Sequence, residues 1–408
     1  LTYYRLWDND DTLDDIIASY EREHKNVKIE VRKIPIAEEE TIYEYQNDLI
    51  KEIADDKGPD MFMIHNDWLP YQINQIYPAP SSVISLEEYQ EKYPEVAIDD
   101  FVESGKIYAM PYFIDNLILY YNIDLFHDAD IPRSQIPPKT WSDVVEVTPK
   151  LTKFDRNGLL TQSAINMGVD NEWVPRFAEI IAALIYQNGG QMTTSDHTKT
   201  IFDLPVTDDK PYYPGENALE FYTDFANPNS SLYTYSDATY TDGSKKFPSD
   251  IQAFLEGKLA MYVGYAYQIE NIRDLKGSFQ FDTTLLPQSR SEEPATIANY
   301  WGETVSRNSD YPQVAWDFIN YVSQKSNLRS YVRATGHVGA SNELIKRDLN
   351  RPYYGPVAKQ VEHSKSWYRS NTPEIEDIFA DMVNSVLHYR TSAKQAIESA
   401  VNKINGLN

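Results

Sequence analysis

The sequence predicts a two-lobed α/β protein in which each lobe is a mostly parallel sheet flanked by helices. Strand-like and helix-like segments alternate from residue 1 to residue 64, the order expected of a parallel sheet wound with helices. The 408 residues are too many for one small core and suit two lobes of ordinary domain size. Residues 105–126 read as strand, bend, strand and helix start without a linker, as expected where a chain passes between lobes.

The N-terminal segments are predicted from their hydrophobic spacing. We expect strands over 1–6, 27–34 and 61–64, separated by helices whose apolar positions recur at helical intervals. Ligands of open α/β sheets bind beyond the carboxyl ends of strands, which selects residues 7–12 and 65–70 as candidate ligand loops. Both loops contain Asp and Trp. For the second loop, the alternative is an acidic exposed turn with an ordinary surface tryptophan.

The segment 105–126 is predicted to be a hinge. Pro111 cannot occupy a central position in a hydrogen-bonded ladder, and residues 117–121 then resume as an apolar, β-prone run. Asn122 begins a helix after that run. A kinked edge strand within a single domain is the alternative reading of these residues.

The remaining chain continues the alternation of helices and strands. Gly189 and Gly190 follow one of the helices and allow the left-handed closure that ends it. A strand is expected over 281–287. Helices are expected over 141–151, 177–186, 218–225, 313–323, 375–387 and 393–404.

Composition excludes several classes of function. A formal net charge of −25 makes nucleic acid and anionic membrane surfaces poor partners. The absence of cysteine excludes disulfides, thiolate nucleophiles and cysteine-ligated zinc. No phosphate-binding loop, serine nucleophile elbow or zinc-binding His-Glu-x-x-His motif occurs, so neither a cofactor nor a metal is expected. Asp8, Asp10 and Thr12 are spaced as in a calcium loop, but Leu13 stands where that loop needs glycine.

Several blocks resemble one protein family. Residues 105–111 (GKIYAMP), residues 117–126 (LILYYNIDLF), and Pro137 with Thr140 and Trp141 are similar to the extracellular solute-binding proteins of ABC importers. Within that group the match is to the carbohydrate-binding family that includes maltose-binding protein. Further similar blocks lie at 58–68, 254–264, 299–309 and 336–340.

The resemblance implies a periplasmic-binding-protein-like fold with the ligand in a cleft between two lobes that close about a hinge. It implies an N-terminal lobe of residues 1–110 and 305–335 and a C-terminal lobe of residues 111–304 and 336–408. The chain is expected to cross between the lobes near 110–114, 303–305 and 334–338.

The expected ligand-binding residues combine aromatic rings, which cover the C–H faces of a sugar, with carboxylates and amides that bond its hydroxyls. Trp301 is expected to be the principal platform, with Trp7 and Trp68 as candidate walls contributed by the other lobe. The full set is Trp7, Asp8, Asn9, Asp10, Asp67, Trp68, Tyr112, Asp115, Tyr265, Tyr267, Trp301 and Glu303.

The resemblance implies the substrate-binding subunit of an ABC transporter, not an enzyme, that captures an oligosaccharide and delivers it to permease subunits. We expect the protein to be a monomer with an extracellular or periplasmic location. We also expect an N-terminal lipid anchor, because the chain starts at Leu1 as if a leader were removed. The many carboxylates leave open a cationic or peptidic solute. A glycoside hydrolase would also use aromatic rings with paired carboxylates, but Asp8, Asp10 and Asp67 lie in polar loops that do not favour a raised pKa.

Overall fold

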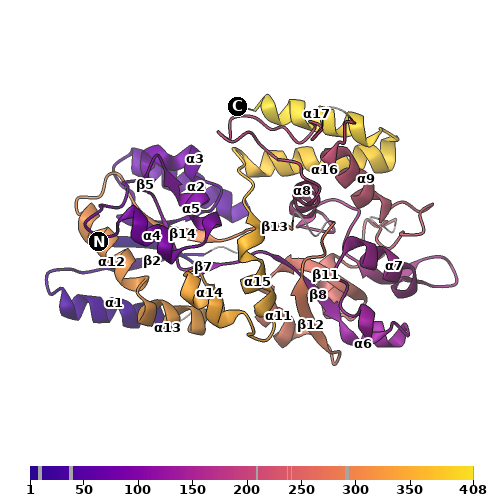
Figure 1. Ribbon diagram of the computed structural model, residues 1–408, viewed down its shortest axis with the longest axis horizontal. Coiled ribbons are helices and arrows are strands. Elements are labelled where there is room, and N and C mark those ends of the chain that lie inside the picture. Colours follow the sequence, from indigo (N-terminus) through magenta and orange to yellow (C-terminus); the bar gives the residue numbers. More distant parts are fainter. Residues whose placement is uncertain are drawn as a thin grey trace. The chain divides into compact units, whose positions relative to one another are not determined.

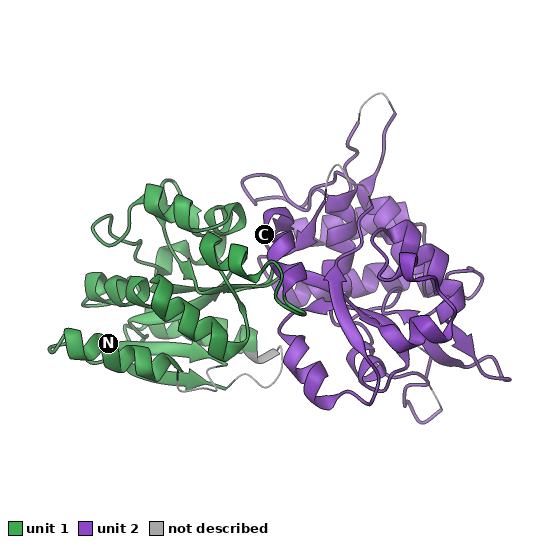
Figure 2. Ribbon diagram, turned by 60° about the horizontal axis from the view of Figure 1, so that its bottom comes forward, with its two compact units in different colours: residues 1–115, 298–354 green, residues 116–297, 355–408 purple. Residues whose placement is uncertain are grey.

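The computed structural model describes residues 1–7, 12–35, 40–207, 210–236, 238–239, 241–289 and 294–407. The chain divides into two compact units, coloured green and purple in Figure 2. Unit 1 consists of residues 1–115 and 298–354, and unit 2 of residues 116–297 and 355–408. Both units combine strands with helices (Figure 1), which confirms the predicted α/β class.

The central sheet of unit 1 has the strand order β2-β1-β3-β14-β6. Strand β1 runs parallel to β2 and β3, whereas β14 runs antiparallel to both β3 and β6. The strands are β1 (Thr2–Leu6), β2 (Glu30–Ile34), β3 (Met61–His65), β6 (Met110–Pro111) and β14 (Trp301–Val305). All five residues of β14 are buried, so this late segment belongs to the core of unit 1.

Helices and short strand pairs complete unit 1. The helices are α1 (Thr12–Glu23), α2 (Glu40–Ala54), α3 (Leu69–Gln72), α4 (Leu86–Lys92), α5 (Glu95–Phe101), α12 (Pro312–Val322), α13 (Lys325–Thr335) and α14 (Asn342–Asp348), with a 3₁₀ turn at Ile73–Gln75. The pairs are β4 (Val102–Glu103) with β5 (Lys106–Ile107), and β7 (Phe113–Ile114) with β15 (Val338–Gly339). Ser85 begins α4 in a capping box with Glu88, and Gly336 ends α13 in the left-handed conformation that glycine favours.

The central sheet of unit 2 has the order β12-β8-β11-β10-β9, and only β10 and β11 run parallel. Every residue of β8 and β11 is buried, so these strands form the middle of the core. The strands are β8 (Leu117–Asn122), β9 (Lys153–Phe154), β10 (Leu160–Ile165), β11 (Leu259–Tyr265) and β12 (Phe281–Leu285). A separate parallel pair joins β13 (Thr296–Ile297) and β16 (Ser364–Lys365).

Helices surround this second sheet. They are α6 (Ile123–Asp128), α7 (Trp141–Leu151), α8 (Phe177–Gln187), α9 (Pro214–Asp224), α10 (Asp250–Leu255), α11 (Gln268–Leu275), α15 (Gly355–Gln360), α16 (Thr372–Tyr389) and α17 (Ala393–Asn405), with 3₁₀ turns at Arg133–Gln135 and Val361–His363. The helices expected over 141–151, 177–186, 375–387 and 393–404 are therefore present. Within the described residues no helix is both long and apolar enough to cross a bilayer.

Two features differ from the expectations. The sheets are mixed rather than mostly parallel, because in each unit the ladder also recruits antiparallel strands from segments distant in sequence. The βαβ order of residues 1–64 cannot reveal such additions. Residues 111–115, 298–304 and 336–354 were expected in the C-terminal lobe but lie in unit 1, where β14, β7 and β15 pair with strands of that unit.

Candidate ligand-binding site

Four aromatic side chains gather in unit 1 where its first and third strands end. Trp301, the first residue of the antiparallel strand β14, pairs in register with His65, the last residue of β3. The ring of Trp301 lies edge-on to Trp7, His65 and Trp68, with centroids 5.2, 5.2 and 5.0 Å away. We call Trp7, His65, Trp68 and Trp301 the aromatic platform. It unites the three tryptophans that were predicted to bind ligand.

Trp7 is the most exposed ring of the platform and has an unusual backbone. Its side chain is 42% exposed, whereas Trp301 and Trp68 are 4% and 2% exposed. Its φ of 53° lies in the left-handed region, which costs a bulky residue on the order of 1–3 kcal/mol. Such strain is characteristic of functional positions. A large ring held in this conformation and left open to solvent is the strongest indication of a ligand-contacting residue in unit 1.

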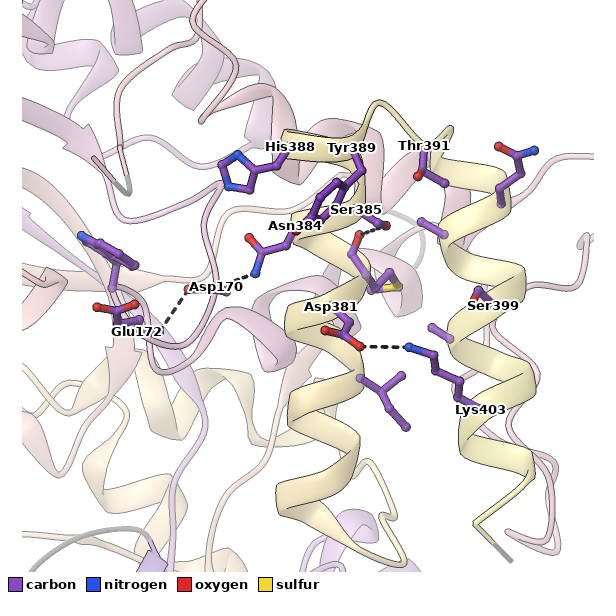
Figure 3. Close-up of a pocket in the computed structure, with 16 residues that line it drawn as sticks. Asp170, Glu172, Asp381, Asn384, Ser385, His388, Tyr389, Thr391, Ser399 and Lys403 are labelled. Carbon is purple, nitrogen blue, oxygen red and sulfur yellow. Dashed lines mark hydrogen bonds and ion pairs between the residues drawn. The ribbon is translucent and has the colours of Figure 1, made fainter. Parts of the chain in front are cut away.

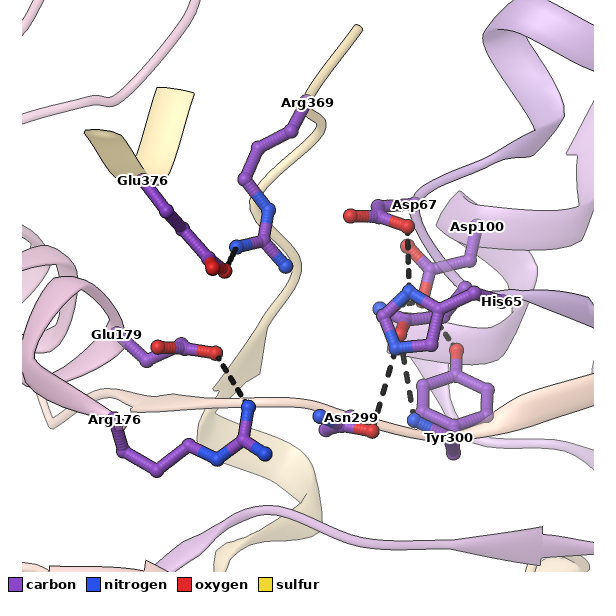
Figure 4. A network of polar contacts seen from close by, with 10 residues as sticks. His65, Asp67, Asp100, Arg176, Glu179, Asn299, Tyr300, Arg369 and Glu376 are labelled. Carbon is purple, nitrogen blue, oxygen red and sulfur yellow. Dashed lines mark hydrogen bonds and ion pairs between the residues drawn. The ribbon is translucent and has the colours of Figure 1, made fainter. Parts of the chain in front are cut away.

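Polar groups flank the platform. His65 Nδ1 lies 2.5 Å from Asp67 Oδ1, and His65 Nε2 lies 3.3 Å from Asn299 Oδ1 (Figure 4). Asp67 is almost completely buried. The Tyr300 hydroxyl donates to Asp100, and the Asn66 backbone N–H donates to the Tyr300 carbonyl at 3.0 Å. These bonds join the loop after β3 to the segment before β14 and so fix the polar rim of the platform.

The other predicted residues of unit 1 have different surroundings. Tyr112 is fully buried and its hydroxyl donates to the Ile319 carbonyl at 3.3 Å. Asp115 is buried, and its carbonyl accepts from the Asn299 N–H at 3.0 Å. Glu303 is buried and its carboxylate accepts from Arg5 and Tyr3. The predicted residues Asp8, Asn9 and Asp10 lie outside the described residues.

The two predicted residues of unit 2 lie together at the end of β11. The rings of Tyr265 and Tyr267 stack with centroids 6.2 Å apart. Tyr265 is buried, whereas Tyr267 is 46% exposed. Arg176 Nη2 donates to the Tyr267 hydroxyl at 3.2 Å, and the guanidinium carbon lies 5.6 Å from the centre of the Tyr265 ring. Tyr265, Tyr267 and Arg176 therefore form one cluster.

Charged side chains beside this cluster were missed by the sequence analysis. Arg176 Nη1 lies 3.3 Å from Glu179 Oε1 at the start of α8, and Arg369 Nη1 lies 3.0 Å from Glu376 Oε1 on α16 (Figure 4). The sequence held one signal, because Glu179 is the one charged residue in the mostly apolar helix α8. Arg369 and Glu376 gave no comparable signal, since both occur in polar stretches.

The pKa of Glu376 provides a test of this charged cluster. Burial raises the pKa of the Glu376 carboxyl from 4.5 to about 7, and the nearby Glu179 adds to this rise while Arg369 opposes it. The folded protein therefore holds this proton more tightly than the unfolded chain. The resulting stabilisation is complete below the ordinary pKa and is lost as the pH rises through about 7.

We therefore expect the free energy of unfolding of the wild type, relative to Glu376→Gln, to decrease between about pH 4.5 and about pH 7 and then to level off. Urea unfolding of both proteins across this range measures the difference. Parallel curves for the two proteins would show that Glu376 titrates normally.

A groove of about 660 Å³ also lies in unit 2 between α16, α17 and residues 170–173 (Figure 3). Two of its carboxylates already have partners in the protein: Asp381 accepts from Lys403 at 2.9 Å, and Asp170 accepts from Asn384 at 2.7 Å. Neither Tyr265 nor Tyr267 lines it. In the described part of the chain, no three His, Asp or Glu side chains are grouped as metal ligands. The aromatic clusters remain the better candidates for a ligand site.

The chain is similar in sequence to known binding proteins. The chain is 24% identical over 301 residues to the maltodextrin-binding protein MdxE of Bacillus subtilis, an alignment covering 73% of this chain and 65% of that protein. It is 23% identical over 318 residues to the sn-glycerol-3-phosphate-binding periplasmic protein UgpB of Brucella melitensis, covering 74% and 67%. The chain thus spans about two thirds of the length of these relatives, and slightly less for MdxE.

The fold matches solved structures over its whole length. The cyclic alpha-maltosyl-1,6-maltose binding protein of Arthrobacter globiformis superimposes with a TM-score of 0.79 at 18% identity, covering 100% of this chain and 98% of that protein. Residues 15–348 match the family described as bacterial extracellular solute-binding protein. Members of this family are binding proteins of transporters and not enzymes. The chain belongs to the bacterial extracellular solute-binding protein family.

Proposed function

We propose that the protein is the extracellular substrate-binding subunit of an ABC importer and that it captures an oligosaccharide. The aromatic platform is the observation that carries this proposal. It presents a half-exposed tryptophan beside the Asp67–His65–Asn299 hydrogen bonds, and sugars are bound by such combinations of ring faces and polar groups. The names of MdxE and of the Arthrobacter protein, which bind maltodextrin and a cyclic maltose derivative, support the same class of ligand.

The charges around those candidate residues that the structure describes favour a neutral ligand. In unit 2, Arg176 pairs with Glu179 and Arg369 pairs with Glu376, so both guanidinium groups already have a carboxyl partner. In unit 1, the Asp67 carboxylate is already engaged by His65. A cationic or peptidic solute, or an anion such as the glycerol phosphate named for UgpB, would have to displace partners from these pairs. A neutral polyol can use their remaining donors and acceptors without doing so.

The proposal includes partners and location. Permease subunits of an importer are the partners that family membership supports, and the location is extracellular or periplasmic. We further propose that the protein acts as a monomer and is held at the membrane by an N-terminal lipid. The roles assigned to Trp7, Trp301, Tyr265 and Tyr267 are part of this proposal.

Calorimetric titration against a ligand panel tests the assignment. The panel contains linear and cyclic malto-oligosaccharides, glycerol 3-phosphate, spermidine and a cationic peptide. We expect micromolar or tighter binding, about −8 kcal/mol or more, for a neutral oligosaccharide only. Prolonged incubation with the best sugar is expected to release no reducing ends. Preferential binding of spermidine, the peptide or the phosphate would refute the carbohydrate assignment, and sustained sugar cleavage would refute a purely binding role.

Ligand binding is expected to make the two units close on each other. Chain segments connect the units at three places, after residues 115, 297 and 354, and rotation about a few such residues can occur without repacking either core. Small-angle scattering should therefore show a smaller radius of gyration at saturating oligosaccharide. An unchanged radius at saturation, verified by calorimetry on the same sample, would count against hinge closure.

A further inference from the structure

A buried ion pair lies on the same face of the unit 1 sheet as the aromatic platform. Alternate residues of a strand share a face, so Glu303 on β14 lies on the face of Trp301. Arg5 on β1 contacts Glu303 on this face. The ladder pairs Trp301 with His65 and Glu303 with Met63. Strand β3 separates β1 from β14. The side chains of Arg5 and Glu303 therefore meet across Met63, which lies two residues before His65 of the platform on β3.

The contacts of this pair involve both of its charged groups. Arg5 Nη1 donates to Glu303 Oε1, and the Tyr3 hydroxyl donates to Glu303 Oε2 at 2.5 Å. Arg5 Nη2 donates to the Tyr331 hydroxyl on α13, also at 2.5 Å. Arg5 is 0% and Glu303 is 1% exposed. Burial raises the pKa of the Tyr3 hydroxyl well above its ordinary value, so this group remains a donor.

Stability alone is a weak reason for such a pair. The cost of removing two charges from water can exceed their mutual attraction, and apolar residues of similar volume are often as good or better. What an ion pair adds is geometric selectivity, because its hydrogen bonds form in only one alignment of the strands. Here the hydrogen bonds select the alignment of β14 against β3.

Gly302, on the opposite face of β14, favours the same alignment of this strand. A Cβ atom added to Gly302 would lie 2.7 Å from Phe101 Cζ and 2.8 Å from Ala109 Cβ, so this position has no space for a side chain. Sliding β14 by one residue would exchange its two faces. The side chain of Trp301 or Glu303 would then enter the space beside Phe101 and Ala109 that admits only glycine. Arg5 would also lose Glu303 as its partner.

We propose that Arg5 and Glu303 are positioning residues that hold β14 in the alignment that presents Trp301 to the other rings of the platform. The consequence for ligand affinity rests on the proposed function. The consequence for the platform does not, because the arrangement of the tryptophan rings can be measured without any ligand.

The test compares three variants. In the double variant Arg5→Met with Glu303→Met, apolar side chains of similar length replace the pair, so no charge is left buried alone. The Tyr3 and Tyr331 hydroxyls lose these partners, so a moderate decrease in the unfolding midpoint is expected. Glu303→Gln keeps the shape and one acceptor for Arg5. Val305→Ala is the matched control, since it removes buried apolar volume from β14 without touching the pair.

Near-ultraviolet circular dichroism reports the packing of the tryptophan rings, and calorimetry with a malto-oligosaccharide reports affinity. For the double variant we expect an altered tryptophan signal and at least about tenfold weaker binding. Glu303→Gln should lie between it and the wild type in both readouts. Val305→Ala should lose stability yet keep the wild-type signal and affinity.

The positioning role would be overturned if the double variant kept the wild-type spectrum and affinity. If the double variant does not fold, the same result in Glu303→Gln would overturn it. Equal losses in Val305→Ala would also overturn it, since general destabilisation of β14 would then be sufficient. If the wild type binds no oligosaccharide, the proposed function fails while the spectra still decide the positioning role.

Discussion

Replacing Trp301 by alanine is expected to weaken oligosaccharide binding by about two orders of magnitude or more, or about 2.7 kcal/mol. The ring of Trp301 contacts Trp7, His65 and Trp68, so its removal takes away the centre of the platform and the packing that holds the other rings in place. Because the ring is also buried, the variant should lose roughly 3–5 kcal/mol of stability. Calorimetry well below the melting temperature measures the affinity separately from this loss.

Trp316→Ala is the matched control for this variant. Trp316 is fully buried on α12 in the same unit and donates from Nε1 to the Tyr77 carbonyl at 2.8 Å. Its loss should destabilise the protein to a similar degree while leaving affinity unchanged. Equal losses of affinity in both variants would place Trp301 in the core rather than in the binding site.

Trp7→Gly is expected to weaken binding by about 10- to 100-fold without destabilising the protein. The exposed ring contributes little to the core, and glycine accepts the φ of 53° that strains tryptophan. The unfolding free energy should therefore stay level or rise by about 1 kcal/mol.

Trp7→Ala separates the two effects of that substitution. Alanine removes the ring but keeps the unfavourable φ, so it should share the affinity loss of Trp7→Gly without the gain in stability. The readouts are chemical unfolding and titration with the same oligosaccharide. Wild-type affinity in both variants would remove Trp7 from the site.

The proximity of Trp7 and Trp68 could be predicted from the sequence, but the position of Trp301 beside them could not. Two of these residues follow strands whose order along the chain marked them as parallel, and the carboxyl ends of parallel strands lie at one edge of a sheet. The resemblance implied that Trp301 belongs to the other lobe, whereas it lies in unit 1 with them. Their roles toward a ligand stay predictions until binding is measured.

The surroundings of the carboxylates could not be predicted. Glu303 was expected to contact ligand, yet its carboxylate accepts from Arg5 and Tyr3, residues at the other end of the chain. Local sequence shows that a residue is acidic but not which distant side chain will neutralise it. The same reason explains why Arg369 and Glu376 were missed, since their pairing depends on how α16 packs.

The limits of the two units were also only partly predictable. The segment around Trp301–Val305 was expected to cross between lobes, whereas it forms a fully buried strand of the unit 1 sheet. A five-residue strand with Gly302 at its second position gives a weak signal, because glycine disfavours strands in general. Here the close approach of Phe101 and Ala109 requires glycine at that position, and this approach is visible only in three dimensions.

The central claim is that the aromatic platform binds the sugar, and a crystal structure with the best-binding oligosaccharide from the panel tests it most directly. The account predicts a pyranose ring lying against Trp7, with sugar hydroxyls bonded to the polar groups around Asp67 and Asn299. A bound oligosaccharide that contacts none of Trp7, Trp68 and Trp301 would contradict the account.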